Sequence, residues 1–272
     1  MRVGLITSDP HHPLLSSTAA LLNDEARMET WDPSASEGES ESIADIYLLK
    51  ARTPRALAIA RGLEERGARV MNSAAATALL QDRTAMAGRA LQAGLPFAAT
   101  RTFATLAQLA SRHGGGAAVH RPLVVKSRHS RRRDLVARVE SAHELRELAS
   151  AWPEEPVVAQ EFAPNSGWDY KLWVIGDRMF AALRRSELAP QGRGPARFLA
   201  PDSLPSDWQA AVRRVGEVFA LDVYGVDIVD LGDGTPLIVD INAFPGVRGQ
   251  PDAPQALAAL IRHRVNGPPI EG

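Results

Sequence analysis

The sequence contains no cysteine, and this absence excludes several kinds of chemistry. A chain without cysteine has no disulfide scaffold, no thiol nucleophile, no iron–sulfur cluster and no cysteine-ligated zinc. It also lacks any run of about 20 apolar residues, the length that a membrane-spanning helix needs. The apolar run that follows Met1 is too short for the core of a signal peptide. We therefore expect a cytoplasmic protein with no membrane partner.

Net charge is nearly absent as well, because the chain has 31 basic and 32 acidic residues, which gives a formal charge of −1. A near-neutral chain does not carry a whole-surface nucleic-acid footprint, so we expect no nucleic-acid partner. Lysine is also scarce, since 3 of the 31 basic residues are lysine and 28 are arginine. In such a chain we expect lysine where a compact ammonium group is needed. The three lysines are Lys50, Lys126 and Lys171.

The first part of the 272-residue chain alternates short apolar runs with helical segments. Strands are predicted over 3–7, 28–31, 46–49 and 69–71, and a helix runs from Pro54 to Gly67. Strands that alternate with helices predict βαβ units and a mainly parallel sheet. The first region is therefore expected to be an α/β domain.

The rest of the chain favours antiparallel hairpins packed with helices. Two helices are predicted first, then a hairpin with a basic tip, then strands that alternate with single helices. The helices are expected over 73–93, 106–112, 141–152, 206–219 and 253–265, and the strands over 122–126, 135–139, 157–162, 169–175, 178–183, 224–229 and 237–242. The expected fold class is α/β followed by α+β.

Two of these strands place oxygen-bearing side chains inside apolar runs. Asp227 lies between Val226 and Ile228, and Asp240 and Asn242 are two residues apart, so they point to the same sheet face. Two carboxylates and an amide suit Mg²⁺, which binds a few carboxylates and completes its shell with water and phosphate. The alternative is a solvated sheet face with polar residues at alternate positions. The apolar flanks argue against that alternative, since burying unpaired carboxylates is costly.

Taken in order, these segments resemble the ATP-grasp superfamily. The matching stretches, over roughly residues 70–250, read VVKSRHSRRRDLV, AQEF, WDYKLWVIGDRMFAALRR, YGVDIV and VDINAFPG. The resemblance implies an ATP-grasp fold with two α+β lobes that clasp ATP and an N-terminal Rossmann-like (pre-ATP-grasp) domain. The implied boundaries are 1–80 for the N-terminal domain, 81–158 for the central lobe and 159–272 for the C-terminal lobe with the metal site.

The resemblance also implies ATP as a cofactor, together with Mg²⁺ or Mn²⁺. The metal would bridge the ATP phosphates and be held by Asp227, Asp240 and Asn242. The adenine pocket would be lined by three consecutive residues: Gln160, Glu161 and Phe162. The Glu161 carboxylate would accept a hydrogen bond from the exocyclic amine of the base. Lys126 and Lys171 would contact the phosphates, and the catalytic residues would be Lys171 and Arg185, of which Arg185 stabilises the transferred phosphoryl group.

One residue and one loop depart from the pattern of the superfamily. Arg83 stands where relatives commonly have the lysine of an N-S…D-K segment, which puts its nucleotide contact in question. Many relatives also cover the phosphates with a glycine-rich loop, whereas the loop after Lys126 contains arginines instead. These arginines, Arg128 and Arg131 among them, either replace the backbone cradle or bind an anionic second substrate. The alternative is an ordinary solvated hairpin tip.

The resemblance leaves open which reaction the chain catalyses, because its segments are similar to two branches of the superfamily. The segment from Leu48 to Arg83 resembles RimK-like ligases, which activate a carboxylate as an acylphosphate and join it to an amine of an amino acid or peptide. The run IVDINAFPGVRG resembles inositol trisphosphate/tetrakisphosphate kinases, which phosphorylate a polyol. A nucleotide-binding module without turnover is a third interpretation. The N-terminal region favours the ligase branch.

The second substrate is expected at the carboxyl ends of the N-terminal strands, where open α/β sheets bind ligands. Lys50 and Arg52 follow the strand 46–49, and His11 and His12 follow the first strand. The histidine pair is more typical of a surface turn than of a substrate site. We expect a small-molecule or peptide substrate with a carboxylate, and the sequence leaves open whether the chain forms a homo-oligomer.

Overall fold

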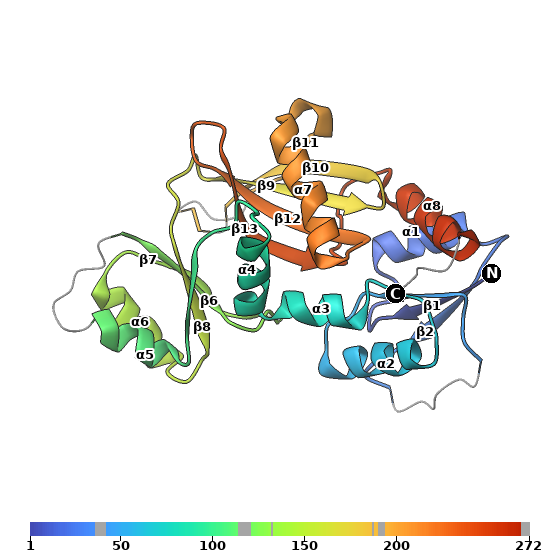
Figure 1. Ribbon diagram of the computed structural model, residues 1–272, viewed down its shortest axis with the longest axis horizontal. Helices are drawn as coiled ribbons and strands as arrows, with labels where there is room; N and C mark the ends of the chain where they lie inside the picture. Colours follow the sequence, from blue (N-terminus) through green and yellow to red (C-terminus); the bar gives the residue numbers. More distant parts are fainter. Residues whose placement is uncertain (36–41, 114–120, 132, 187, 190–193, 268–272) are drawn as a thin grey trace.

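The computed structural model describes residues 1–35, 42–113, 121–131, 133–186, 188–189 and 194–267. Within these residues the strands form three sheets that follow one another along the long axis of the molecule (Figure 1). No helix among the described residues is long and apolar enough to cross a membrane.

The N-terminal sheet is parallel and has the strand order β2-β1-β3-β4. Its elements are β1 (Arg2–Ile6), α1 (Pro13–Leu21), β2 (Arg27–Trp31), β3 (Ile46–Leu49), α2 (Pro54–Glu65) and β4 (Val70–Met71). Helix α2 begins as its sequence predicts, with Pro54 in the first turn and the Thr53 side chain accepting a hydrogen bond from the Ala56 N–H. The predicted parallel α/β unit is confirmed.

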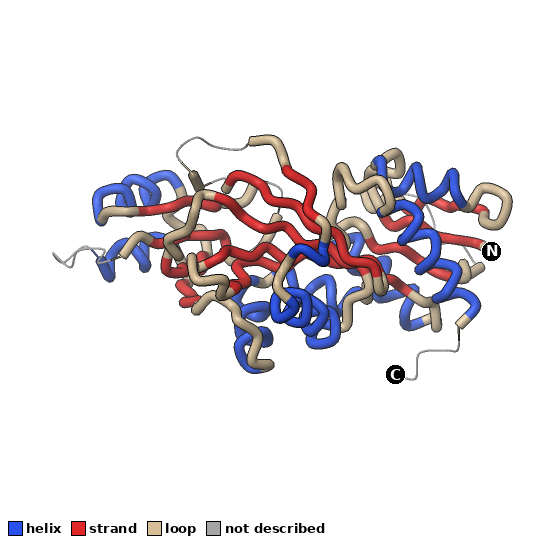
Figure 2. The backbone as a smooth tube through the Cα atoms, turned by 90° about the horizontal axis from the view of Figure 1, so that it is seen from above, coloured by secondary structure: helices blue, strands red, loops and turns tan. Residues whose placement is uncertain are grey.

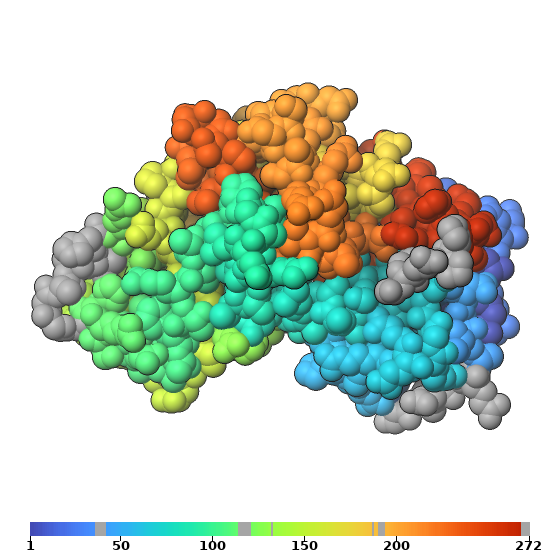
Figure 3. Space-filling view, viewed as in Figure 1, coloured from blue at the N-terminus to red at the C-terminus, as the bar shows by residue number. Residues whose placement is uncertain are grey.

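The helix predicted over 73–93 is two helices, so that prediction is wrong. The structure has α3 (Ala74–Gln81) and α4 (Arg83–Gln92), separated at Asp82. Asp82 has extended backbone geometry, and its carboxylate accepts hydrogen bonds from the Thr84 and Ala85 N–H groups as the N-cap of α4. The break makes Arg83 the first residue of a new helix. In Figure 3 the teal surface of α3 and α4 connects the blue N-terminal part to the green part.

The middle sheet is antiparallel, with the order β5-β8-β6-β7. Leu123 and Val125 of β6 and Ala159 of β8 point to one face, where they pack with α5 and α6 in a hydrophobic core. Strand alternation therefore turns Lys126 and Gln160 to the opposite face. The elements are β5 (Thr100–Phe103), α5 (Leu106–His113), β6 (Leu123–Ser127), β7 (Val136–Val139), α6 (Ala142–Ala151) and β8 (Val157–Glu161). Of these, β5 was not predicted.

The largest sheet is antiparallel, with the order β11-β10-β9-β12-β13. Leu172, Val226 and Ile241 point to one face, where they form a core with residues of α4 and α7. The elements are β9 (Trp168–Ile175), β10 (Arg178–Arg185), β11 (Arg197–Leu199), the 3₁₀ helix η1 (Pro201–Ser203), α7 (Ser206–Phe219), β12 (Val223–Asp230), β13 (Pro236–Ala243) and α8 (Ala253–Asn266). The short edge strand β11 and η1 were not predicted.

Buried contacts join the N-terminal sheet to the largest sheet. Leu15 of α1 and Leu257 of α8 belong to one core cluster, so these two helices pack together at the same end of the molecule (Figures 1 and 2). Asn72 is 1% exposed, and its side chain bonds the backbone at the start of β12. The domain boundaries at residues 80 and 158 stay predictions.

Candidate functional site

A cavity of about 200 Å³ lies between the middle sheet and the largest sheet. It is lined by the faces of both sheets that do not pack on helices. Its charged and polar lining includes Arg83, Lys126, Gln160, Glu161, Asn165, Asp169, Lys171, Ser186, Asp227 and Asp240. Most of the residues singled out by the sequence therefore meet in one place.

Three charged residues stand in a row across the largest sheet. Lys171 of β9 is the register partner of Asp227 of β12, and Asp227 is the partner of Asp240 of β13. Direct cross-strand partners point to the same face. This is the face opposite Leu172 and Val226, which pack in the core. The strand register thus gathers a cation and two carboxylates at the cavity.

Lys171 and Asp227 form an ion pair, with 2.5 Å between Lys171 Nζ and Asp227 Oδ2. Burial alone lowers the pKa of the Lys171 ammonium, but the Asp227 carboxylate and its hydrogen bond outweigh burial and raise it. Lys171 therefore keeps its charge at neutral pH. It supplies a fixed positive charge in the cavity wall.

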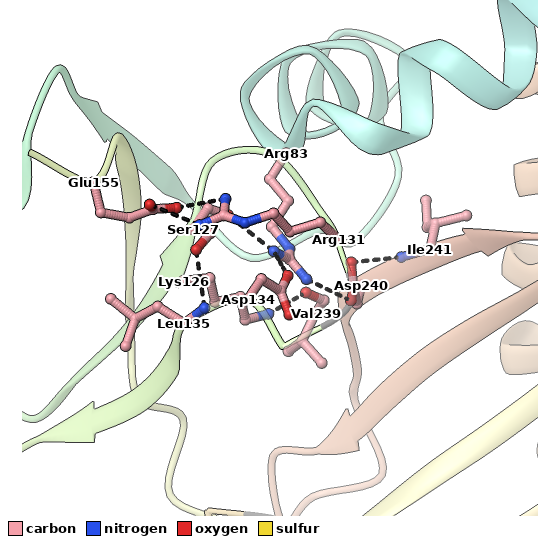
Figure 4. Close-up of polar contacts among 10 residues, drawn as sticks. All are labelled: Arg83, Lys126, Ser127, Arg131, Asp134, Leu135, Glu155, Val239, Asp240 and Ile241. Carbon is pink, nitrogen blue, oxygen red and sulfur yellow. Dashed lines mark hydrogen bonds and ion pairs between the residues drawn. The ribbon is translucent and has the colours of Figure 1, made fainter. Parts of the chain in front are cut away.

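Lys126 connects the two sheets across the cavity. Lys126 is 7% exposed, and its Nζ donates a hydrogen bond to the Val239 carbonyl of β13 at 2.8 Å (Figure 4). Burial lowers the pKa of the Lys126 ammonium, and the nearby Asp240 carboxylate offsets part of that effect. An ammonium has three donors, so two remain for other partners.

Arg83 lies at the same end of the cavity and is 6% exposed. Its Nη1 donates to the Ser127 carbonyl at 2.9 Å and to Asp134 Oδ2 at 2.7 Å, and its Nη2 lies 3.6 Å from Asp240 Oδ2 (Figure 4). Burial lowers the pKa of the guanidinium, whereas Asp240 and Asp134 more than compensate and raise it. Asp134, which the sequence did not single out, is its closest carboxylate partner.

Two of the three oxygen donors expected for a metal lie together at the cavity. Asp227 and Asp240 both line the cavity, whereas Asn242 lies opposite Gly225, farther along β13, outside the lining residues. The described part of the chain has no cluster of three or more His, Cys, Asp and Glu side chains suited to a metal. The two adjacent carboxylates supply the few protein oxygens that Mg²⁺ needs beside water and phosphate, whereas the three cations fit the phosphate groups.

The other end of the cavity carries the residues predicted for the adenine base. Gln160 is 5% exposed and donates from Nε2 to Thr100 Oγ1 at 3.0 Å. The Phe162 ring lies under the Arg138 guanidinium, 4.0 Å from the ring centroid. The Glu161 side chain is 66% exposed and pairs with Arg121 at 3.2 Å. Its carboxylate is therefore engaged at the surface, and a contact to the base stays a prediction.

The strand register separates Arg185 from the cavity face. Arg185 is the partner of Trp168, and its guanidinium lies 5.2 Å from the centroid of that indole. Arg184 is the partner of Asp169, which shares the face of Lys171. Arg184 therefore lies on the sheet face of Lys171, although neither arginine is among the lining residues of the cavity, and the catalytic role of Arg185 stays a prediction.

Comparisons with known proteins show the family and the fold of the chain. The family model of the RimK-like ATP-grasp domain matches residues 107–259, which is more than half of the chain. The chain belongs to the RimK-like ATP-grasp family. A "Probable alpha-L-glutamate ligase 2" of Hahella chejuensis is 28% identical over 162 residues, which cover 54% of this chain and 52% of that protein. The chain thus spans about half the length of this curated relative.

Solved structures show the ATP-grasp fold over nearly the whole chain. A RimK domain ATP-grasp protein from Sphaerobacter thermophilus has a TM-score of 0.75 and 23% identity, and the match covers 98% of this chain and 100% of that one. The D-cycloserine synthetase DcsG has a TM-score of 0.74 and 16% identity, with 97% of this chain and 100% of that chain covered. The expected fold is confirmed.

In this RimK-like protein the arginine-rich loop is tied to its own surroundings. The Arg128 guanidinium pairs with Asp82 at 2.6 Å, and Arg131 pairs with Glu155 at 2.7 Å. Neither arginine is among the lining residues of the cavity. The structure therefore does not bring them to the predicted phosphate site, and their role toward a substrate stays a prediction.

Two of the predicted second-substrate residues, Lys50 and His12, lie beside the segment 244–248 that follows β13. Lys50 Nζ donates to the Phe244 carbonyl at 3.3 Å, and its pKa is lowered to about 8 by burial and by the nearby Arg52. His12 accepts a hydrogen bond from the Leu14 N–H, as the N-cap of α1, and a Cβ at Gly246 would lie 3.1 Å from its Nε2. His11 is exposed. Lys50 and His12 therefore border one junction, between the N-terminal sheet and the largest sheet.

Proposed function

We propose that the chain is an ADP-forming ATP-grasp ligase that activates a carboxylate as an acylphosphate and joins it to an amine. The observation that carries the proposal is a set of three cations, two of them buried and one partly buried, facing two adjacent carboxylates in one cavity. The cations are Arg83, Lys126 and Lys171, and the carboxylates are Asp227 and Asp240. Such a set matches the charge of a triphosphate with a divalent cation.

The residues of the cavity have distinct parts in the proposal. Lys126 and Lys171 donate to phosphate oxygens, while Phe162 and Gln160 border the base. Asp227 and Asp240, with Asn242 as the third donor, would hold Mg²⁺ or Mn²⁺, which neutralises phosphate charge when bound. The protein contributes alignment and charge stabilisation, so no covalent nucleophile is required.

The substrates in this proposal are a carboxylate and an amine of an amino acid or peptide. The name of the Hahella relative, a probable alpha-L-glutamate ligase, supports this class. Lys50 and Arg52, at the junction with the segment 244–248, supply positive charge for a substrate carboxylate. Neither the polyol kinase nor the non-catalytic module is favoured, because the matched family model is the RimK-like one and the charged set of the cavity is intact.

The experiment that tests the proposal follows ADP and phosphate release with ATP, Mg²⁺ and pools of amino acids and acidic peptides. We expect ADP and free phosphate in equal amounts, dependent on both a carboxylate and an amine, together with a product whose mass equals their sum minus water. ADP with phosphate retained on a polyol would instead identify a kinase. ATP binding without ADP release would identify a binding module.

A further inference from the structure

The loop between β6 and β7 comprises residues 128–135, of which Arg132 lies outside the described part of the chain. Backbone hydrogen bonds fix the described residues of this loop to two other segments. The Arg83 N–H donates to the Arg128 carbonyl at 2.9 Å, and the Ser130 N–H donates to the Gln81 carbonyl at 2.8 Å. These bonds attach the β6–β7 loop to the junction of α3 and α4. The Arg128 N–H also donates to the Pro156 carbonyl at 2.7 Å, before β8.

Three ion pairs reinforce the β6–β7 loop, and they differ in burial. In the pairs of Arg128 with Asp82 and Arg131 with Glu155, the arginine side chains are 38% and 46% exposed. In the pair of Arg83 with Asp134, the side chains are 7% and 15% exposed. Exposed ion pairs contribute little to stability, whereas removing one partner of a buried pair is strongly unfavourable. Of the three ion pairs, we therefore expect the Arg83–Asp134 contact to contribute most to holding the β6–β7 loop in place.

Arg83 extends this contact to the opposite wall of the cavity. Its Nη1 is held by Asp134 and by the Ser127 carbonyl, which fixes the plane of the guanidinium. Its Nη2 then faces Asp240 of β13 at 3.6 Å (Figure 4). A guanidinium presents its donors in a rigid fork, whereas the single ammonium of a lysine does not. An arginine at this position can therefore connect the loop to the sheet.

We propose that Asp134 and Arg83 are positioning residues that hold the β6–β7 loop against the cavity and set the place of the Asp240 carboxylate. Asp134 acts through Arg83, and Arg83 acts on Asp240. The chain has no glycine between Lys126 and Val136, so a side-chain bridge rather than a glycine-rich backbone holds the loop beside the cavity. The effect on nucleotide use rests on the proposed function, but the effect on the loop does not.

The first test measures hydrogen–deuterium exchange of the β6–β7 loop without nucleotide. The amides to follow belong to Arg128, Ser130 and Leu135, all of which donate hydrogen bonds. In Asp134→Asn we expect their exchange to be at least about tenfold faster, because the buried guanidinium loses its closest charged partner. Arg83→Lys keeps the charge but not the fork, and we expect faster exchange there too. Asp134→Glu should restore slow exchange.

A matched control removes an exposed ion pair elsewhere. Glu217→Gln breaks the pair with Arg214, whose side chains are 57% and 64% exposed, and should leave exchange in the loop unchanged. Unchanged exchange in both Asp134→Asn and Arg83→Lys, with native circular dichroism, would overturn the proposal. If Asp134→Asn does not fold, Arg83→Lys decides, since it retains a buried cation beside Asp134 and Asp240.

The second test separates positioning from a general structural role. In Asp134→Asn we expect the KM for ATP to rise about tenfold while kcat falls less, because the lysines that contact phosphate are intact. Unchanged KM together with unchanged kcat, in a variant whose loop exchanges faster, would contradict a positioning role toward the nucleotide and Asp240. If exchange in the loop rises but no carboxylate and amine pair supports turnover in the parent protein, the proposed function fails and the positioning of the loop stands.

Discussion

Asp227 lies directly opposite Asp240 in the antiparallel pairing of β12 and β13. Like charges at opposed positions repel each other across a strand pair. Each carboxylate has its own cation, since Lys171 pairs with Asp227 at 2.5 Å and Arg83 lies 3.6 Å from Asp240. A divalent cation bound between the carboxylates would take over part of this neutralisation.

The first prediction concerns the Asp240→Asn substitution. We expect ATP turnover to fall on the order of 100-fold or more, because charge stabilisation by a bound metal is worth several kcal/mol in the transition state. We also expect Mg²⁺ with an ATP analogue to raise the Tm of the parent protein and to leave that of the variant nearly unchanged. Calorimetry and an ADP-release assay measure the two effects.

The matched control for this prediction is Asp24→Asn, which changes an exposed aspartate far from the cavity residues in the sequence. It should keep both the turnover and the shift in Tm. Full turnover in Asp240→Asn would show that Asp240 holds no metal and that the cavity carboxylates have another role.

A second prediction separates two neighbouring arginines of β10. Arg184 shares the sheet face of Lys171, whereas Arg185 lies on the other face against Trp168. We expect Arg184→Ala to lower kcat about 100-fold, which is typical for the loss of one donor to developing charge. Arg185→Ala should lower it only severalfold. Steady-state kinetics with saturating ATP compares the two variants, and the opposite order would restore Arg185 as the catalytic residue.

The choice between these two arginines shows where the sequence stops being informative. The four long strands of the largest sheet were predictable, because apolar runs at strand length are bounded by turn residues. The common face of Asp240 and Asn242 also followed from their spacing. Consecutive residues of a regular strand point to opposite faces, so choosing between Arg184 and Arg185 requires the pairing register with β9. The register depends on neighbours that are distant in sequence.

Other features that the sequence did not predict have local or tertiary causes. The break between α3 and α4 had a signal, since Asp82 is a good N-cap residue inside an apolar pattern. Strand β5 reads TRTF, with two exposed residues, and its pairing with β8 decides its structure. The roles of Asp134 and Arg138 depend on which side chains the loop and β7 bring near them. No spacing along the chain indicates those contacts.

A third prediction concerns pH and Lys50. Burial, with help from Arg52, lowers the pKa of the Lys50 ammonium from 10.5 to about 8, so it is charged below pH 8 and neutral above it. If Lys50 binds a substrate carboxylate, the KM for that substrate should be constant below pH 8. It should rise by up to about tenfold for each pH unit above 8, as the cation is lost. KM profiles from pH 6.5 to 9.5 measure this.

Lys50→Arg is the control for the pH profile, because a guanidinium keeps its charge throughout this range. We expect its profile to be flat, even if its absolute KM is higher. An equally steep rise in Lys50→Arg would assign the titration to another group. A flat profile in the parent protein would show that the charge of Lys50 does not contribute to substrate binding.

The last prediction concerns Asn72, which fastens the N-terminal sheet to β12. Its Oδ1 accepts hydrogen bonds from the Asp222 and Val223 N–H groups at 2.8 and 3.1 Å, and its Nδ2 donates to the Val223 carbonyl at 2.7 Å. In Asn72→Ala the backbone groups of Val223 lose these partners in a buried place. The Val223 carbonyl still accepts a hydrogen bond from the Phe244 N–H, so the Val223 N–H is the buried group that loses its partner. A buried unsatisfied group costs about 1–3 kcal/mol, and we expect the free energy of unfolding to fall by that amount.

Denaturant unfolding followed by circular dichroism measures this loss, with Asn23→Ala as the control at an exposed asparagine. Asn72→Asp should also destabilise the protein, because it keeps the acceptor, loses the donor and buries a charge. A loss below about 1 kcal/mol in Asn72→Ala would mean that water replaces the lost side chain. In that case Asn72 would not be what holds the two sheets together.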